Sequence, residues 1–462
     1  MAVKKIYTVT DLGPGDGGKG GVVHKISHMT RAHTIIKVGG GQGSHGVRTS
    51  SGENFAFSHW GCGTFEGVRT HLTPRIVIIP EGILNEGDAL IYQHGVHNAF
   101  DLLTVDDRAL CATPYHGITS RLKEMALGGN PRGTIGTGVG EAYRDSLRVP
   151  ELSIHACDLY REGLRNWLAA VRDEQIRKLE PIIQKGFLPD DQEEAAKEIA
   201  LLRDDGFLDH IYKRFRETAA RVQIVDHEYL EKEILARDGI VVVESSHGVL
   251  TDHFHGFHPH TSAIRTLPCF TREMLWQNDY RGDIVNIGVT RAYQIRHGAG
   301  PMPTTDPEMT ESLLPGSHKE NNRYQGDIRV GPLDTVLLRY ALEVCGGPTA
   351  FDGLAVTWFD QIQKNGVWHV CESYQNADDR TYFTPEGNLK VRRGMDDAQL
   401  EYQEALGKQL FTCIPRIKTY NLQPDADRGQ YYSLCANVLK EQLGIDVRMI
   451  SFGPTELDKV FK

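Results

Sequence analysis

Three things are scarce or missing in this chain, and each absence argues against a class of protein. The cysteines form no C-x-x-C pair, which argues against a zinc site or a disulfide framework. The formal net charge is −10, so basic residues are not in excess and a nucleic-acid-binding surface is not expected. No hydrophobic run is long enough for a signal peptide or a membrane span. We therefore expect reduced thiols, a cytoplasmic protein that binds neither nucleic acid nor membrane, and small anions as partners.

The pattern of apolar residues predicts an α/β fold. The first 150 or so residues are rich in glycine, with short β-branched runs at 34–38 and 75–79 that indicate a mainly parallel sheet. Residues 158–237 carry dense charge with apolar residues at helical intervals, which predicts a helical insertion or subdomain. Further strands are expected at 240–243, 283–287, 353–357 and 447–451, and a helix over 333–344. The length allows one large domain, 1–462, around a large central sheet.

A phosphate-binding loop with one departure follows the first strand-like run. Residues 13–20, Gly-Pro-Gly-Asp-Gly-Gly-Lys-Gly, match G-x-x-x-x-G-K but lack the final Ser or Thr that helps to hold Mg²⁺. Asp16 lies inside the loop instead, where a carboxylate would be repelled by phosphates unless it binds a cation or transfers a proton. The alternative interpretation is an ordinary strand-to-helix turn in which Asp16 caps the helix.

Two further glycine-rich segments carry reactive side chains. Residues 39–46 place His45 on a loop that a ligand can approach, where it can act as a general acid; an exposed His in a plain turn is the alternative. Residues 133–140 combine Thr134 and Thr137 with four glycines, which suits a monophosphate bound by N–H and O–H donors. A flexible surface loop would show the same composition.

Histidines and arginines gather on later loops. The segment 247–261 holds five histidines and Asp252, which suggests a metal site, but glycine and proline break the run and favour a polar pocket wall. Arg323 and Arg329 lie on turn-rich segments, where arginine binds carboxylates or phosphates or is simply solvated.

Taken in order, these segments resemble the adenylosuccinate synthetase family, whose members join aspartate to a 6-oxopurine nucleotide while a nucleoside triphosphate is cleaved. The family's W-G-D-E-G-K-G is similar to residues 14–20, and its G-G-x-N-A-G-H-T to residues 39–46. Its G-T-T-G-x-G-I-G-P-A-Y-x-D is similar to residues 133–145, and its E-G-A-Q-G-x-L-L-D-x-x-x-G-x-Y-P-x-V-T-S to residues 244–259 with Thr261 and Ser262. Its R-x-G-A-G-P-x-P-T is similar to 296–304, and its R-x-G-W-x-D to 329–334. Its T-K-L-D is similar to 357–360, and its I-S-x-G-P to 450–454.

The resemblance implies a fold related to P-loop NTPases, Mg²⁺ as cofactor, a homodimer, and three small substrates: a nucleoside triphosphate, a purine monophosphate and L-aspartate. It implies that the aspartate loop lies in 265–350 and the triphosphate-base loop in 351–462. The implied catalytic residues are Asp16 as general base, His45 and Lys19, with Asp16 and Ser44 as metal ligands. The implied triphosphate-binding residues are Gly15, Gly17, Gly18, Lys19, Gly20, Trp358, Asp360, Gly453 and Pro454. The implied substrate-binding residues are Gln42, Thr134, Thr137, His247, Thr261, Arg323 and Arg329.

Departures from the family motifs fall at ligand positions. The loop Glu is Gly17, the Asn before the catalytic His is Gln42, and the Gln that contacts the purine is His247. A phosphate-loop Thr is Ile135, and the guanine-loop Lys is Trp358. Inosinate is the default acceptor, with guanylate, deoxyguanylate or a modified purine nucleotide as the alternative and either GTP or ATP as donor. Two other classes compete: a P-loop NTPase or kinase, and an inactive paralogue that binds nucleotides.

Overall fold

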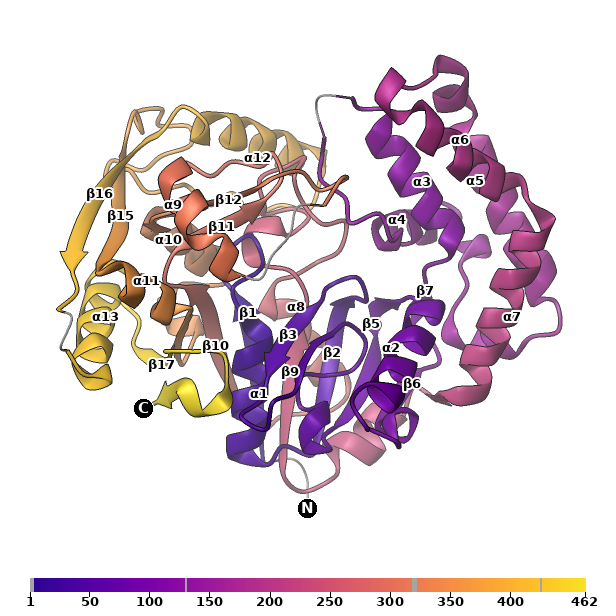
Figure 1. Cartoon of the computed structure of the whole chain (residues 1–462), viewed down its shortest axis with the longest axis horizontal. Coiled ribbons are helices and arrows are strands. Elements are labelled where there is room, and N and C mark those ends of the chain that lie inside the picture. The colour runs from indigo at the N-terminus through magenta and orange to yellow at the C-terminus, as the bar shows by residue number, and fades with distance from the viewer. Residues whose placement is uncertain (1–3, 129–130, 318–321, 424–425) are drawn as a thin grey trace.

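The computed structural model describes residues 4–128, 131–317, 322–423 and 426–462, and it is built around one twisted sheet (Figure 1). The sheet has 11 strands, and every pairing in it is parallel except that between the last two strands of the chain. From edge to edge its strands are β18 (Lys459–Phe461), β17 (Val447–Ser451), β14 (Gly353–Thr357), β10 (Asp283–Arg291), β1 (Lys5–Asp11), β9 (Ile240–Ser245), β2 (Thr34–Gly40), β5 (Arg69–Ile78), β6 (Leu103–Asp106) and β8 (Gln223–Val225), with β7 (Leu110–Cys111) beside β5. This confirms the predicted large, mostly parallel sheet.

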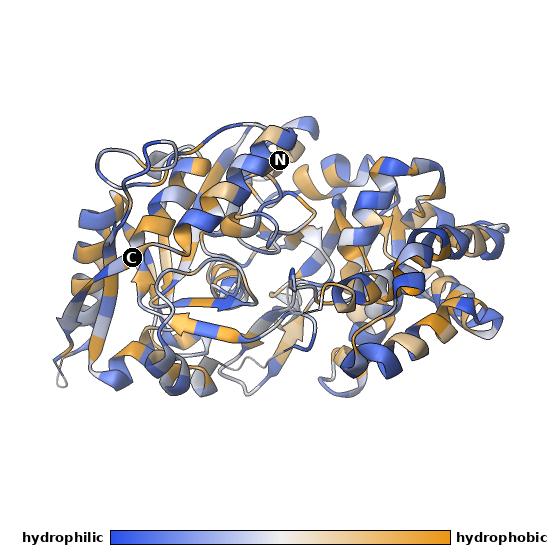
Figure 2. Cartoon of the chain, turned by 90° about the horizontal axis from the view of Figure 1, so that it is seen from above, coloured by the Kyte–Doolittle hydropathy of each residue, from blue (hydrophilic) through white to orange (hydrophobic). Residues whose placement is uncertain are grey.

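Both faces of the sheet are apolar and covered, as parallel sheets require. On one face, Val9, Ile35 and Val242 pack with residues of α1 and of the helices that follow β5. On the other, Ile6 and Val241 pack against α8 and the π-helical turn at 230–235. Figure 2 shows this distribution, with hydrophobic colour concentrated in the strands and mixed colour on the outer helices. The helices are α1 (Lys19–Thr30), α2 (Pro80–Tyr92), α3 (Pro114–Met125), α4 (Val139–Arg148), α5 (Leu164–Lys185), α6 (Gln192–Arg203), α7 (Asp205–Arg221), α8 (Pro268–Gln277), α9 (Pro307–Leu313), α10 (Thr335–Val344), α11 (Phe359–Asn365), α12 (Asp397–Leu410) and α13 (Arg428–Leu443).

Two lobes flank the sheet in Figure 1. One is formed by α3 to α7, in which α5 and α6 pack against α3 and α7 packs against α2. The other contains α9 to α13 and three small-sheet strands, β13 (Leu333–Asp334), β15 (Val367–Gln375) and β16 (Ile414–Asn421). Two hairpin-like pairs complete the fold: β3 (His45–Arg48) with β4 (Asn54–Phe57), and β11 (Gln294–His297) with β12 (Ile328–Gly331).

Two predicted elements differ from the observed ones. Helix α10 begins at Thr335 rather than 333, because the carboxylate of Asp334 accepts the backbone N–H groups of Val336 and Leu337 and so caps the helix. The region 158–237 is helical only in part, since 223–225 forms the edge strand β8 beside β6. The β-branched residues around 222–225 explain that strand, which the charge pattern obscured.

All eight cysteines, which lie in the described part of the chain, are free thiols, as predicted. Within the described ranges, no helix combines the length and apolar character needed to cross a membrane.

Candidate active site

The phosphate loop joins β1 to α1 and is organised by a buried acid, Asp11, at the end of β1. The Asp11 carboxylate accepts the N–H groups of Gly13 and Gly17, each at 2.8 Å, and the Lys19 ammonium at 3.0 Å. A β-carbon on Gly17 would lie 2.7 Å from Asp11 Oδ2, so only glycine fits there. The Lys19 ammonium also donates to the carbonyl oxygen of His247 at 2.7 Å, which ties the loop to the segment after β9.

Asp16 stands apart from this network and faces a cavity. Its φ is 58°, a left-handed value that is uncommon outside glycine and is often found at functional sites. Its backbone oxygen accepts the Nε–H of Arg291 at 2.6 Å, and its Oδ2 lies 3.0 Å from His297 Nε2. The N-cap of α1 is Gly18, without a side-chain cap, so Asp16 does not serve as the helix cap. The Asp16 side chain therefore lines the cavity beside His297.

The cavity has a volume of about 890 Å³ and is lined both by loops of the sheet and by residues of the lobe formed by α3 to α7. Its walls come from loops after β1, β2 and β9, from α3 to α5, and from β11, which matches the rule that parallel sheets bind ligands at the carboxyl ends of their strands. Seven predicted site residues line it: Gly15, Asp16, Gln42, Thr134, Thr137, His247 and Thr261.

His45 lies behind the phosphate loop and is held by a buried ion pair. Its Nδ1 is 2.6 Å from Glu244 Oε1, and the ammonium of Lys37 is 3.1 Å from the same oxygen. Burial alone would raise the pKa of Glu244, but Lys37 and His45 outweigh it and hold that pKa well below its ordinary value. Burial lowers the pKa of His45. Cys62 approaches the same carboxylate, and the ligand-type atoms of Cys62, His45 and Glu244 lie within 4.8 Å of one another. The ammonium of Lys37 already supplies the positive charge that balances the carboxylate of Glu244.

His247 and Gln42 form one polar wall of the cavity. The side-chain amide of Gln42 lies 3.0 Å from His247 Nε2, and Gln42 Oε1 is buried with no hydrogen-bond partner among the described residues. Burial and the nearby Lys19 charge lower the pKa of His247 to about 4, so its ring is neutral at pH 7. The Gln42 amide nitrogen only donates, so His247 Nε2 accepts from it and the hydrogen of the neutral ring is on Nδ1. Gln42 Oε1 can accept a hydrogen bond from an N–H or O–H group of a polar heterocycle. His253, His258 and His260 also line the cavity, in agreement with a pocket wall rather than a metal cluster.

The predicted monophosphate loop borders the cavity before α4. Gly133, Gly136 and Gly138 have φ of 90°, 83° and 85°, which only glycine adopts readily, and Thr134 Oγ1 lies 2.8 Å from Ser120 Oγ. The first turn of α4 follows directly, and N–H groups at the start of a helix favour a bound anion.

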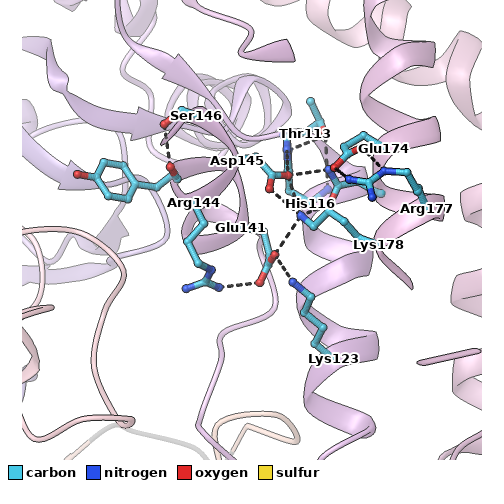
Figure 3. Close-up of polar contacts among 12 residues, drawn as sticks. Thr113, His116, Lys123, Glu141, Arg144, Asp145, Ser146, Glu174, Arg177 and Lys178 are labelled. Carbon is cyan, nitrogen blue, oxygen red and sulfur yellow. Dashed lines mark hydrogen bonds and ion pairs between the residues drawn. The ribbon is translucent and has the colours of Figure 1, made fainter. Parts of the chain in front are cut away.

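A buried carboxylate in α4 gathers cations at this end of the cavity (Figure 3). Glu141 accepts from Lys123 at 2.7 Å and from Arg144 at 2.6 Å, and Lys178 is 3.4 Å away. In Figure 3, Lys123 and Arg144 approach Glu141 from two sides, and Lys178, drawn above Lys123, is bound to Asp145. Burial would raise the pKa of Glu141, but Arg144 and Lys123 outweigh burial and lower it to about 2.

This cluster predicts a dependence of stability on pH. The folded-state pKa of Glu141 is about 2 and the ordinary value is 4.5, so its contribution is complete above pH 4.5 and is lost as the pH falls towards 2. At pH 7, Glu141→Gln should therefore reduce the free energy of unfolding by roughly 3 kcal/mol. Urea unfolding at pH 7 and at pH 3 measures the difference, which should shrink at the lower pH. An equal loss at both values, or a loss in the exposed control Glu162→Gln, would contradict the charge-based account.

The residues predicted to bind the base of the triphosphate follow strands β14 and β17, near the phosphate loop. Thr357 Oγ1 at the end of β14 donates to the carbonyl oxygen of Gly17 at 2.7 Å. Trp358 follows with φ of 61°, and the guanidinium of Arg291 lies 4.3 Å from the centre of its ring. Asp360 is in the first turn of α11, and Gly453 and Pro454 follow β17, the strand next to β14.

Among the residues that the structure describes, several of the predicted site residues do not line the cavity. Arg323 lies at the surface and pairs with Asp191 at 2.9 Å, and Arg329 donates to the carbonyl oxygens of Gly298 and Gly300. His45 and Lys19 are buried, as are Gly17 and Gly20, while Gly18 is half-buried and Ser44 is exposed. Arg296 is the arginine that reaches the cavity from this region. Burial lowers its pKa to about 9, and its Nε has no partner among the described residues.

Comparison with known proteins agrees with this arrangement. The family model for adenylosuccinate synthetase matches residues 9–460. The chain belongs to the adenylosuccinate synthetase family. Adenylosuccinate synthetase of Marinomonas sp. strain MWYL1 is 26% identical over 455 residues, covering 95% of this chain and 94% of the relative. That of Alkalilimnicola ehrlichii is 25% identical over 452 residues, covering 96% and 95%.

Two solved structures show the same fold. Fully ligated adenylosuccinate synthetase from Plasmodium falciparum superposes with a TM-score of 0.75 at 16% identity, and covers 99% of both chains. Cyanophage S-2L succinoaminodeoxyadenylate synthetase (PurZ), bound to dGMP and to dATP as energy donor, gives a TM-score of 0.56 at 16% identity, covering 99% of this chain and 95% of that one. As a member of the adenylosuccinate synthetase family, the chain is a carbon–nitrogen ligase that joins aspartate to a purine nucleotide.

Proposed function

We propose that this ligase joins L-aspartate to the 6-position of a 6-oxopurine nucleotide through a 6-phosphoryl intermediate, with inosinate as the default acceptor and GTP or ATP as the phosphoryl donor. One observation carries the proposal. The acid of the phosphate loop, Asp16, faces the same cavity as the monophosphate-loop residues Thr134 and Thr137. The Asp16 carboxylate, the proposed general base on the loop that binds the phosphoryl donor, therefore borders the volume that an acceptor nucleotide would fill.

The two chemical steps follow from the acceptor. A 6-oxo group leaves poorly, so it must be phosphorylated before an amine can displace it. In the first step Asp16 removes the N1 proton and His45 stabilises the 6-oxygen, which attacks the γ-phosphorus of the triphosphate. The bond between the β- and γ-phosphates breaks, and the nucleoside diphosphate leaves. Backbone N–H groups of the loop and Lys19 stabilise the phosphoryl charge. In the second step the amine of aspartate displaces the phosphate. The cavity-facing Arg296 is suited to bind a carboxylate of aspartate, a role for which the motifs predicted Arg323 and Arg329.

The residues at the loop fit Mg²⁺. A hard cation of this kind prefers oxygen ligands, and the cavity-lining Asp16 and the exposed hydroxyl of Ser44 are oxygen donors near the predicted phosphate site. When bound, Mg²⁺ would neutralise charge on the phosphates of the donor. We also propose a cytoplasmic homodimer; sedimentation at micromolar concentration would measure the assembly, and a monomer there would contradict it.

A different acceptor is the second candidate, favoured by the wall formed by His247 and Gln42. Adenylosuccinate synthetases carry Gln and Asn at these motif positions, so the hydrogen-bond pattern offered to the base differs. Guanylate, deoxyguanylate or a modified purine nucleotide would present an additional or altered donor to Gln42 Oε1, which is unpaired among the described residues.

A product assay tests both candidates. Purified protein is incubated with Mg²⁺, GTP or ATP, aspartate and a panel of inosinate, guanylate and deoxyguanylate, and products are identified by mass spectrometry. We expect an aspartate-dependent succinyl-amino nucleotide with at least one acceptor. Phosphate release without an adduct would indicate an NTPase instead, and nucleotide binding without turnover would indicate an inactive paralogue.

A further inference from the structure

His297 holds a position that the motifs leave without a role. It is the last residue of β11, and its side chain lines the cavity with 12% of its surface exposed. One ring nitrogen, Nε2, lies 3.0 Å from Oδ2 of Asp16. The other, Nδ1, is buried without a hydrogen-bond partner in the described part of the chain.

The contact with Asp16 assigns the proton on the ring. A carboxylate only accepts hydrogen bonds, so Nε2 carries the hydrogen and donates it to Asp16. In the neutral ring Nδ1 then keeps a lone pair and is an acceptor. A buried acceptor without a donor is unfavourable, and such groups in native proteins are usually satisfied by water or a ligand. The cavity beside His297 is where a ligand would supply that donor.

We propose that His297 binds the acceptor nucleotide and positions the general base at the same time. Its Nε2–H holds the carboxylate of Asp16 in place, and its Nδ1 accepts a hydrogen bond from an N–H or O–H group of the purine nucleotide. This inference rests on the proposed function, because it takes Asp16 as the base and the cavity as the acceptor site. It adds a polar contact from β11 to the cavity that the glycine-rich monophosphate loop also lines.

Two substitutions separate the two nitrogens. In His297→Gln the side-chain amide reaches the position of Nε2, so the donor to Asp16 is kept and the Nδ1 acceptor is lost. We expect KM for inosine 5′-monophosphate to rise about tenfold while kcat stays within about twofold, as loss of one hydrogen bond predicts. In His297→Asn the shorter amide overlaps Nδ1 and no longer reaches Asp16. Its kcat should fall about tenfold or more, with little change in KM.

The matched controls are His369→Gln and His369→Asn. His369 is on β15, away from the cavity, and its Nδ1 bonds to Thr419 Oγ1 at 2.9 Å at the surface. Both control variants should retain wild-type kinetics, and thermal unfolding would confirm that all four variants are folded. Wild-type kinetics in both His297 variants, or the same loss of kcat and KM in each, would overturn the assignment of separate roles to the two nitrogens.

Binding without turnover distinguishes failure of this inference from failure of the proposed function. If the wild-type protein forms no aspartate-dependent product, the proposed function is wrong. Calorimetric titration with inosine 5′-monophosphate then still tests His297: about tenfold weaker binding by His297→Gln alone would support the contact from Nδ1. Unchanged binding would overturn it. If the wild type binds none of inosinate, guanylate and deoxyguanylate, both proposals are overturned.

Discussion

Replacing Asp16 with asparagine should lower kcat by about 10²- to 10⁴-fold, the usual contribution of a positioned general base. Asparagine keeps the size of the side chain and an oxygen that can accept from His297 Nε2, 3.0 Å from Asp16 in the wild type. It cannot remove a proton, and it is a weaker ligand for a cation. The phosphorylation step should therefore fail while the loop keeps its shape, because Asp11 rather than Asp16 organises the loop backbone.

The measurement pairs turnover with binding. Steady-state product formation gives kcat, and calorimetric titration with inosine 5′-monophosphate gives the dissociation constant, which should change by less than about threefold because chemistry and ground-state binding are separate readouts. Asp378→Asn, at an exposed position, is the matched control and should behave as the wild type. Wild-type turnover in Asp16→Asn would remove Asp16 from the mechanism. Weaker nucleotide binding with unchanged kcat would assign it a binding role.

Replacing Glu244 with glutamine should destabilise the protein by about 3–5 kcal/mol and also inactivate it. Glu244 is fully buried beside Lys37 and His45, at 3.1 Å and 2.6 Å. Removing its charge leaves the Lys37 ammonium buried without its counter-ion, which is the costly case for a buried pair. The activity loss has a separate cause, since the carboxylate orients His45 and stabilises its charged form.

A double variant separates these two causes. Lys37→Met in the Glu244→Gln background removes the unpaired charge, so stability in urea unfolding should recover in large part. Activity should not recover, because His45 still lacks its carboxylate. The matched control is Glu193→Gln, which breaks an exposed pair with Lys197 and should change neither quantity measurably. A double variant no more stable than Glu244→Gln would contradict the account based on the buried charge.

Local sequence patterns predicted most of the sheet and several of the site loops. The β-branched runs became β2, β9, β10, β14 and β17, because a strand buried on both faces needs a continuous apolar run. The glycine-rich loops also carried a local signal, since positive φ and close backbone approach leave few alternatives to glycine. The edge strand β8 was missed, because three residues among dense charge give too short a periodic signal.

The partners of the side chains that we propose as catalytic could not be predicted in the same way. Asp11 is the last residue of the buried strand β1, directly before the loop, which is a signal carried by the local sequence. The ion pair between Lys37 and Glu244 could not have been, because it joins neighbouring strands that are far apart in sequence. Arg296 belongs to the segment that resembles R-x-G-A-G-P-x-P-T, but only its burial at the cavity marks it as the arginine that a ligand meets.

By itself, the sequence determined that a parallel sheet presents a phosphate loop with an acid, Asp16, and that His45 and two more glycine-rich loops accompany it. These features depend on backbone conformations and apolar periods that a few neighbouring residues impose. Only the tertiary structure decided which groups meet: Asp16 with His297, His45 with Glu244 and Lys37, and His247 with Gln42. Such contacts arise from the order of strands in the sheet and from burial, which fix the distances and charges around a side chain and are properties of the whole chain.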